Sequence, residues 1–205
     1  MTRIVNNCVA LVCLCLFWGQ SLRAADASHS EQIKWGNESV FNEEHNTLGL
    51  FSGVLGGQIV FAGGTSDDYS RWGRNAVCIY ENVGFALYEE LLSKPLAYGA
   101  SITLSDGILC IGGRDSSQCY EDVFFVTMQQ GKLNVSEDWP PLPFPLSNAA
   151  GALLDNKVYL FGGRKSVSPS RLSDSFFVLD LSNKSRGWKE LPGLSLIHIS
   201  EPTRH

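Results

Sequence analysis

The sequence predicts an all-β protein built from about three similar units of four short strands. Its 205 residues include 20 glycines and only 2 methionines, without long runs of helix-forming residues, which favours short strands and tight turns. A pattern of apolar strands, turns and paired glycines also recurs about every 50 residues. The hydrophobic content of 44% is that of a globular protein able to bury a core.

The first 27 residues have the features of a secretory signal peptide. A short basic start precedes an apolar run at residues 8–18, and small residues follow at Ala25 and Ala27. The apolar run is shorter than the roughly 20 residues that a membrane-spanning helix needs. We therefore expect residues 1–27 to be removed, residues 28–47 to form a lead-in, and the mature protein to be secreted or periplasmic.

The last residues of the chain do not continue the repeat. Residues 194–205 resemble the translated read-through of a sequencing adapter, and we expect them to be a non-native tail. The natural sequence would then stop at Gly193, part-way through the repeating pattern. The repeat region is therefore expected to be truncated.

The repeat consists of an apolar strand, a two-residue turn, a second apolar strand and a pair of glycines. It occurs at residues 50–64, 100–113 and 150–163, and its last glycines lie 49 and 50 residues apart. This spacing is the period of kelch repeats. The glycine pairs are Gly63 and Gly64, Gly112 and Gly113, and Gly162 and Gly163.

The turn residues predict that the first two strands of each unit form a hairpin. Gly56-Gly57, Asp106-Gly107 and Asp155-Asn156 are residue types that tolerate a positive φ in a two-residue turn. The second strands, at residues 108–111 and 158–161, are apolar at consecutive positions. Such runs indicate strands that are buried on both faces between stacked sheets.

Two further strands complete each unit. We expect the third strands at residues 76–80, 123–127 and 176–181, followed by an outer fourth strand that ends near Trp139 and near Trp188. The two indoles are large enough to fill the gap between adjacent sheets.

These features together resemble kelch repeats. More specifically, residues 95–113, 142–144 and 188–192 resemble the cyclically permuted mutarotase family, which is related to N-acetylneuraminate epimerase, the bacterial sialic acid mutarotase. The resemblance implies a six-bladed kelch-type β-propeller, of which this chain supplies about three four-stranded blades. It also implies a sugar mutarotase or epimerase that acts on the anomeric centre of N-acetylneuraminate or a related sugar acid without a cofactor. The expected blades are residues 48–94, 95–144 and 145–193.

The loops between second and third strands are the expected site, because in a propeller they open on one face around the central channel. Arg114 and Arg164 directly follow two glycine pairs, and a guanidinium suits a sugar carboxylate. Asp67 and Asp68 share the corresponding loop of the first unit and are further substrate-binding candidates. Asp115 is the catalytic candidate, since mutarotation needs only a base at the anomeric hydroxyl and an acid at the ring oxygen.

The same residues also fit roles in stabilising loops or in binding without catalysis. An arginine after a glycine pair can pair with an aspartate of the next loop, and Asp122 and Asp174 are expected to cap turns. The whole protein can equally be a secreted kelch module that binds a protein or a glycan without catalysis, because a fold does not decide a function. An enzyme would need a further buried carboxylate facing Arg114 across the channel.

The charge and the remaining composition limit the classes of partner that the sequence predicts. A net charge of -5 and the absence of basic runs exclude nucleic acid and, after removal of the signal, a membrane surface. The expected partner is a small sugar acid, and a homodimer is compatible with the sequence. No metal-ligand spacing is present. Cys110 and Cys119 either form a disulfide or remain as a buried residue and a free thiol.

Overall fold

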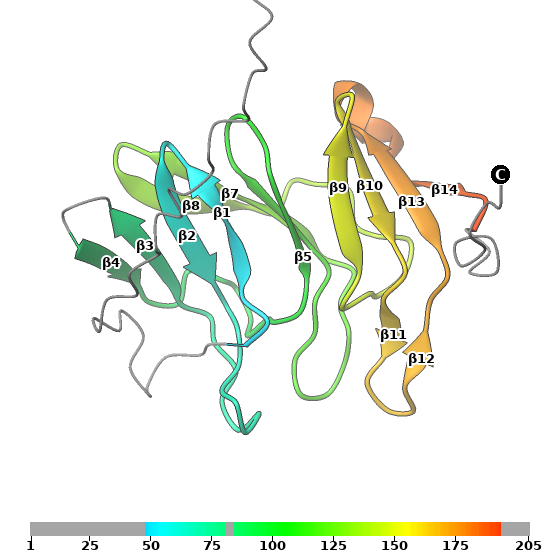
Figure 1. Ribbon diagram of the computed structural model, residues 1–205, viewed down its shortest axis with the longest axis horizontal. Coiled ribbons are helices and arrows are strands. Elements are labelled where there is room, and N and C mark those ends of the chain that lie inside the picture. Colours follow the sequence, from blue (N-terminus) through cyan, green and yellow to red (C-terminus); the bar gives the residue numbers. More distant parts are fainter. Residues whose placement is uncertain (1–47, 81–83, 194–205) are drawn as a thin grey trace, which may run out of the picture. The chain divides into compact units, whose positions relative to one another are not determined.

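The computed structural model describes residues 48–80 and 84–193. These residues form three four-stranded antiparallel sheets, one two-stranded ribbon and one short 3-10 helix, as Figure 1 shows. No described helix is both long enough and apolar enough to cross a membrane. The expected signal peptide, the lead-in and the C-terminal tail lie outside the described residues.

The three large sheets follow one another along the chain and are called the first, second and third sheets. The first sheet contains β1 (Phe51–Leu55), β2 (Gln58–Ala62), β3 (Ala76–Tyr80) and β4 (Gly84–Tyr88), in this order. The second sheet contains β5 (Ala100–Thr103), β6 (Ile108–Ile111), β7 (Val123–Gln129) and β8 (Lys132–Ser136). The third sheet contains β9 (Ala150–Leu154), β10 (Lys157–Phe161), β13 (Phe176–Asp180) and β14 (Lys189–Leu191).

Two of the three predicted hairpin turns are confirmed. Leu55 pairs with Gln58 across Gly56-Gly57, whose φ angles are 56° and 83°. Asp155-Asn156 connects β9 to β10 in the same way, with φ angles of 47° and 59°. Positive φ at both central residues matches the twist of the flanking strands.

The turn predicted at Asp106-Gly107 is wrong. The Leu104 N–H donates to the Gly107 carbonyl at 2.7 Å, so the central residues are Ser105 and Asp106, and neither has a positive φ. Gly107 is required for another reason: a Cβ at this position would clash with the Phe125 ring. A long-range contact therefore explains this glycine.

The third strands lie where the sequence predicts them, but the fourth strands differ between sheets. β8 ends three residues before Trp139, whereas β14 begins directly after Trp188. Both fourth strands therefore end three residues from the tryptophan, as predicted, but β14 follows Trp188 whereas β8 precedes Trp139. A 3-10 helix, Leu181–Arg186, occupies the place of the β7–β8 hairpin, and the Asp180 carboxylate accepts a bond from the Ser182 N–H at 2.9 Å at its start.

Two apolar clusters hold the three sheets together. β1 lies beside β5, and β5 lies beside β9, so the first strands of successive sheets are neighbours. One cluster lies between the first and second sheets, and the other lies between the second and third sheets. Trp139 and Trp188 pack against the second cluster, where the Trp188 Nε1–H donates to the Pro140 carbonyl at 3.0 Å.

The glycine pairs make the junctions between sheets. The Gly64 N–H donates to the Leu96 carbonyl at 2.8 Å, and a Cβ on Gly63 would clash with that same carbonyl oxygen. The pair Gly112–Gly113 repeats this arrangement at Leu146, again with a 2.8 Å bond. Each junction therefore needs a glycine for close backbone approach as well as for a positive φ.

The three described cysteines are buried and free. The disulfide between Cys110 and Cys119 therefore does not form. Burial raises the pKa of the Cys110 thiol, which keeps it protonated at neutral pH. The Cys119 thiol lies 3.4 Å from the Ser147 hydroxyl.

The prediction that both second strands are buried on both faces holds for β6 but fails for β10. All four residues of β6 are buried. In β10, Val158 and Leu160 are buried against the second sheet, whereas Tyr159 and Phe161 are only half-buried. No described sheet covers the side of the third sheet from which these two rings project.

Candidate functional site

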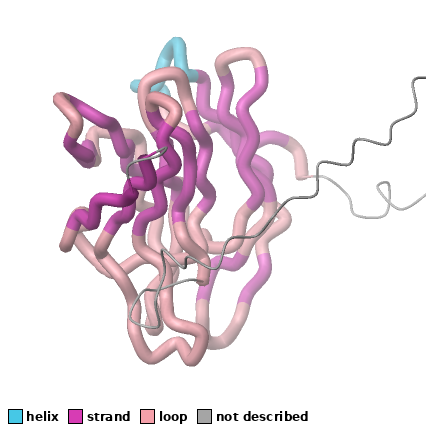
Figure 2. Tube along the Cα trace, turned by 60° about the vertical axis from the view of Figure 1, so that its left-hand side comes forward, coloured by secondary structure: helices cyan, strands magenta, loops and turns pink. Residues whose placement is uncertain are grey.

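The candidate site lies on the loops that follow the glycine pairs. Thr65, Arg114 and Arg164 occupy equivalent positions, each forming a short bridge with the chain that leads into its own sheet. Arg114 exchanges two backbone hydrogen bonds with Ala97, at 2.8 and 2.9 Å. Figure 2 shows these loops below the strands of the large sheets, in pink apart from two short magenta strands in the third loop. The backbone of the arginine is thus fixed by the repeat itself.

The Arg114 guanidinium lies among three aromatic rings. Its Cζ is 4.8 Å from the centroid of the Tyr98 ring, 4.9 Å from that of Trp72 and 5.9 Å from that of Tyr69. The rings also contact one another, with centroids 6.4 to 6.5 Å apart. Cation–π attraction at such distances holds a guanidinium without neutralising its charge. We call Tyr69, Trp72, Tyr98 and Arg114 the aromatic–arginine cluster.

The guanidinium keeps hydrogen-bonding capacity. Within the described residues, its side-chain bond is from Nη1 to the Asp115 backbone carbonyl at 3.2 Å, and its buried Nε has no partner. The ion pairs among these residues join Arg74 to Glu90 and Lys94 to Asp122. The alternative in which Arg114 pairs with an aspartate of the next loop is therefore not what the structure shows.

Tyr98 of the cluster remains a hydroxyl donor at neutral pH. Burial and a hydrogen bond to Tyr69 raise the pKa of Tyr98 to about 12, although the positive charge of Arg114 opposes this shift. The two hydroxyl oxygens lie 3.4 Å apart. Tyr69 is 50% exposed, so one ring of the cluster is open to a ligand.

Asp115 lies beside the cluster, but its carboxylate is engaged within its own loop. It accepts bonds from the Ser117 N–H and hydroxyl, from the Gln118 N–H at 2.9 Å and from the Tyr120 hydroxyl at 2.6 Å. Burial raises the pKa of Asp115, but these bonds outweigh it and lower the pKa to about 2. A carboxylate held in this way fits a loop-stabilising role better than the expected acid/base role.

Asp67 and Asp68 also bond within their own loop. The Asp68 carboxylate accepts bonds from the Ser66 hydroxyl at 2.6 Å and from Ser70, and these lower the pKa of Asp68 to about 2. Asp67 accepts a bond from the Asp68 N–H at 2.9 Å. Both side chains are exposed and lie in the loop that carries Tyr69 and Trp72.

Arg164 lies in a different setting from Arg114. It begins β11 (Arg164–Ser166), which pairs with β12 (Arg171–Leu172) as a separate ribbon. No described aromatic ring lies against its guanidinium, whereas the neighbouring Lys165 places its ammonium 4.1 Å from the centroid of Phe144. The structure therefore does not give the two arginines the same surroundings.

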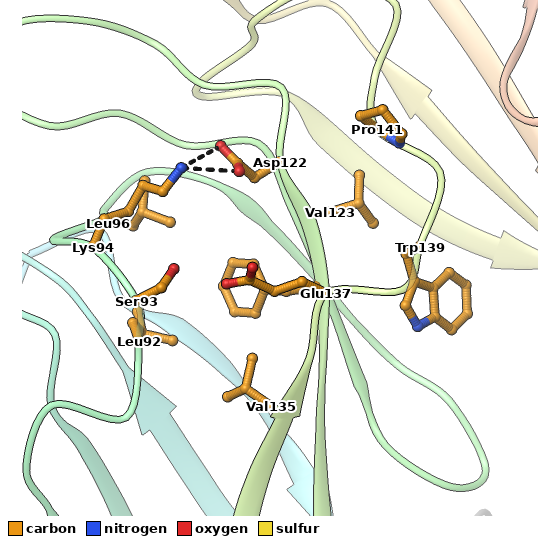
Figure 3. A pocket seen from close by; sticks show the side chains of 11 residues that line it. Leu92, Ser93, Lys94, Leu96, Asp122, Val123, Val135, Glu137, Trp139 and Pro141 are labelled. Carbon is orange, nitrogen blue, oxygen red and sulfur yellow. Dashed lines mark hydrogen bonds and ion pairs between the residues drawn. The ribbon is translucent and has the colours of Figure 1, made fainter.

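A pocket of about 210 Å³ lies on the flank between the first and second sheets. Its polar groups include an ion pair, from Lys94 Nζ to Asp122 Oδ1 at 2.9 Å, the carboxylate of Glu137 and the hydroxyl of Ser93, as Figure 3 shows. Asp122 is therefore paired with a lysine, and the prediction that it caps a turn missed this partner. Because the Lys94 ammonium is already paired with Asp122, the pocket offers less to an anionic ligand than Arg114 does.

Among the described residues, no group of three or more histidine, cysteine, aspartate or glutamate side chains is placed to hold a metal ion.

Comparisons with known proteins agree with this architecture. A family model described as the kelch motif matches residues 145–195. A solved structure titled "Structure of YjhT" is similar with a TM-score of 0.59 and 12% sequence identity. The fold is a kelch-type β-propeller. The similarity covers 72% of this chain but only 56% of that structure. The search of curated proteins found no match.

The sequence predictions missed the aromatic members of the cluster. Tyr69 and Trp72 come from the loop after the first glycine pair, and Tyr98 comes from the lead into the second sheet. The sequence signal for Tyr98 was its spacing, because Gly49, Tyr98 and Asn148 follow the period of the repeat. In the structure all three have a positive φ. This register places Tyr98 at a turn beside the loop that carries Arg114.

Proposed function

We propose that this protein is a sugar mutarotase that binds N-acetylneuraminate or a related sugar acid over the aromatic–arginine cluster. The observation that carries the proposal is Arg114, a cation held by three rings and paired with no carboxylate among the described residues. The kelch-type fold supports it, as does the resemblance of the sequence to the cyclically permuted mutarotase family. The proposed activity is an isomerisation.

The geometry supports a division of work within the cluster. The guanidinium supplies charge-assisted hydrogen bonds to a carboxylate, which fix both its position and its orientation. The exposed face of Tyr69 can pack against the apolar C–H face of a sugar ring. The Tyr98 hydroxyl donates to the Tyr69 hydroxyl, which can in turn donate to a ring substituent.

The reaction conserves all atoms. A base removes the proton of the anomeric hydroxyl and an acid protonates the ring oxygen, so the bond between the anomeric carbon and the ring oxygen breaks. The carbonyl carbon then rotates, and reversal of the proton transfers closes the other anomer. Arg114 holds the carboxylate beside the reacting carbon throughout.

A second candidate, a binding module without catalysis, is favoured by one specific observation. Asp67, Asp68 and Asp115 all accept hydrogen bonds within their own loops. The described part of the site therefore offers groups that bind a sugar acid more clearly than groups that transfer protons.

The experiment compares binding and anomer exchange in the same samples. NMR would follow conversion of α- to β-N-acetylneuraminate with wild type, with Arg114→Ala and with the control Arg186→Ala, which removes an exposed arginine from the 3-10 helix. We expect wild type and the control to accelerate exchange and Arg114→Ala to lose at least tenfold in affinity, because a hydrogen bond between charged groups contributes about 1.5–3 kcal/mol.

Each outcome separates the candidates. Acceleration that Arg114→Ala abolishes supports the mutarotase. Saturable binding without acceleration supports the binding module. Absence of both binding and acceleration in folded wild-type protein rejects both proposals for this sugar acid.

A further inference from the structure

The two gaps between neighbouring sheets carry different side chains at equivalent positions. In the gap between the second and third sheets, the Phe144 ring lies edge-on against Phe177, with centroids 5.3 Å apart. Trp188 reaches across the same gap to the Pro140 carbonyl. Both Phe144 and Trp188 pack against the apolar cluster there, so two large aromatic rings occupy this flank.

Lys94 and Val135 take these two positions in the gap between the first and second sheets. Lys94 lies 50 residues before Phe144. Val135 pairs with the fourth residue of β7, and Trp188, by continuation of the register, lies opposite the fourth residue of β13. A lysine and a smaller aliphatic side chain therefore replace the two rings. The flank pocket of about 210 Å³ lies between them.

The Lys94 ammonium is neutralised within the wall of this pocket. It donates to both oxygens of Asp122, at 2.9 and 3.0 Å, and lies 4.6 Å from the centroid of the Tyr120 ring. In the third sheet Ser175 takes the position of Asp122, since the backbone carbonyl of each accepts a bond from the first glycine of a pair. The lysine and its carboxylate thus occur together in one gap and are both replaced in the other.

Glu137 adds an unpaired negative charge to the pocket. Its carboxylate and the Ser93 hydroxyl point toward one another in Figure 3, and neither side chain has a hydrogen bond or ion pair among the described residues. One ammonium and two carboxylates line the pocket, so one negative charge is left over. A carboxylate and a hydroxyl oxygen both accept hydrogen bonds, and an ammonium has three to donate.

The other walls of the pocket are mainly apolar. Leu92, Leu96 and Phe124 are buried, and Val135 is half-buried. Apolar walls with a few convergent polar groups are typical of small-molecule sites, and a volume below about 300 Å³ suits a ligand smaller than a drug. The lining residues come from the segment 92–96, the start of β7 and the chain around the end of β8. The described chain therefore forms this pocket by itself.

We propose that the flank pocket binds a small organic cation, a primary ammonium carried on a short aliphatic body. The ammonium would donate to the Glu137 carboxylate and to the Ser93 hydroxyl. The aliphatic body would lie against Leu92, Phe124 and Val135. The proposal is independent of the mutarotase function, because the pocket and the aromatic–arginine cluster share no residue.

The test is an NMR titration of the full chain with n-butylammonium chloride at low salt, where ionic attraction is least screened. Glu137→Gln keeps the shape of the side chain and removes its charge. Glu190→Gln makes the same substitution at an exposed glutamate of β14, the register equivalent of Glu137, and is the matched control. We expect saturable binding to wild type and control, and at least about tenfold weaker binding to Glu137→Gln, because a charge-assisted hydrogen bond is lost.

The charge of the ligand is tested with butyrate in place of n-butylammonium. We expect butyrate to give no saturable shifts, because the Lys94 ammonium is already paired and the Glu137 carboxylate repels an anion. Binding of butyrate as tight as that of n-butylammonium would overturn the proposal. Equal affinity of n-butylammonium for wild type and Glu137→Gln would also overturn it.

A double variant tests the space that the ligand needs. Lys94→Phe with Asp122→Ser installs the two residues of the other gap, and we expect it to lose saturable binding while circular dichroism shows that it is folded. Unchanged binding to this folded variant would place the ligand elsewhere and contradict the proposal. Folded wild-type protein that does not bind n-butylammonium would contradict it as well.

Discussion

The second and third sheets have almost the same sequence pattern but different surroundings. β6 of the second sheet is buried at all four positions, whereas β10 of the third sheet is buried only at alternate positions. The first strands differ in the same direction, because β5 has buried residues and β9 is exposed along its length. An unbroken apolar run therefore predicts the burial that a strand needs, and the burial it has depends on a neighbour on each side.

The largest effect on stability should come from adding a side chain at a glycine junction between two sheets. Gly112→Ala would place a Cβ against the Leu146 carbonyl oxygen in a left-handed conformation, and we expect it to destabilise the fold by about 4 kcal/mol. Gly162→Ala has the same conformational cost, but among the described residues its Cβ would make only an ordinary contact with the Ser173 carbonyl oxygen at 3.7 Å, so about 1 kcal/mol is expected. Urea unfolding at low protein concentration would measure both. Equal losses would show that close backbone approach does not matter at Gly112.

Two substitutions compare the side of the second sheet that packs on the third sheet with the corresponding side of the third sheet, which no described sheet covers. Leu109→Ala empties a fully buried position between the second and third sheets, and we expect a loss of about 3 kcal/mol. Tyr159→Ala, 50 residues later, removes a half-buried ring and should lower the unfolding free energy of the monomer by only about 1 kcal/mol. Denaturant midpoints of the two variants measure the difference. A larger loss of unfolding free energy for Tyr159→Ala would mean that another part of the chain covers the side of the third sheet from which Tyr159 projects.

The two gaps between sheets also differ at an equivalent position. Phe144 packs edge-on against Phe177, with ring centroids 5.3 Å apart, whereas Lys94 pairs with Asp122 beside the flank pocket. We expect Phe144→Ala to cost about 2 kcal/mol and Lys94→Ala about 0.5 kcal/mol, because a partly exposed ion pair contributes little. Thermal unfolding would rank them. The reverse order would show that the ion pair, and not apolar packing, holds that flank.

The smallest effect concerns the loops. In the folded protein the pKa of Asp115 is about 2, below its ordinary value of 3.8. The ionised carboxylate therefore contributes to the free energy of unfolding above about pH 4, and this contribution is lost as the pH falls toward 2. Asp115→Asn should therefore flatten the decline in unfolding free energy between pH 4 and pH 2. Acid titration followed by circular dichroism compares it with wild type. Identical pH profiles would show that this carboxylate does not stabilise its loop.

The sequence predicted what depends on local chemistry and repetition. Asp155-Asn156 and the third strands follow from turn residues and apolar runs. The role of Gly107 was missed because it depends on Phe125, which approaches from another strand. The order of Trp188 and β14 was missed because the 3-10 helix replaces a hairpin that the second sheet retains.

The candidate site was predicted less completely, for a related reason. The position of Arg114 follows from the glycine pair that precedes it, but its surroundings come from two other segments of the chain. Asp115 was chosen for its residue type and neighbourhood. Its hydrogen bonds from Ser117 and Tyr120 depend on how its own loop folds.

The position of Trp72 gives the protein a built-in optical reporter. Its indole lies 4.9 Å from the Arg114 guanidinium, and its Nε1–H is bonded to the Tyr69 carbonyl at 3.0 Å. An indole so close to a positive charge changes its emission when that charge is drawn toward an anion. Trp139 and Trp188 lie in the gap between the second and third sheets, away from this loop. Binding of a ligand to Arg114 should therefore change the tryptophan fluorescence of the unlabelled protein.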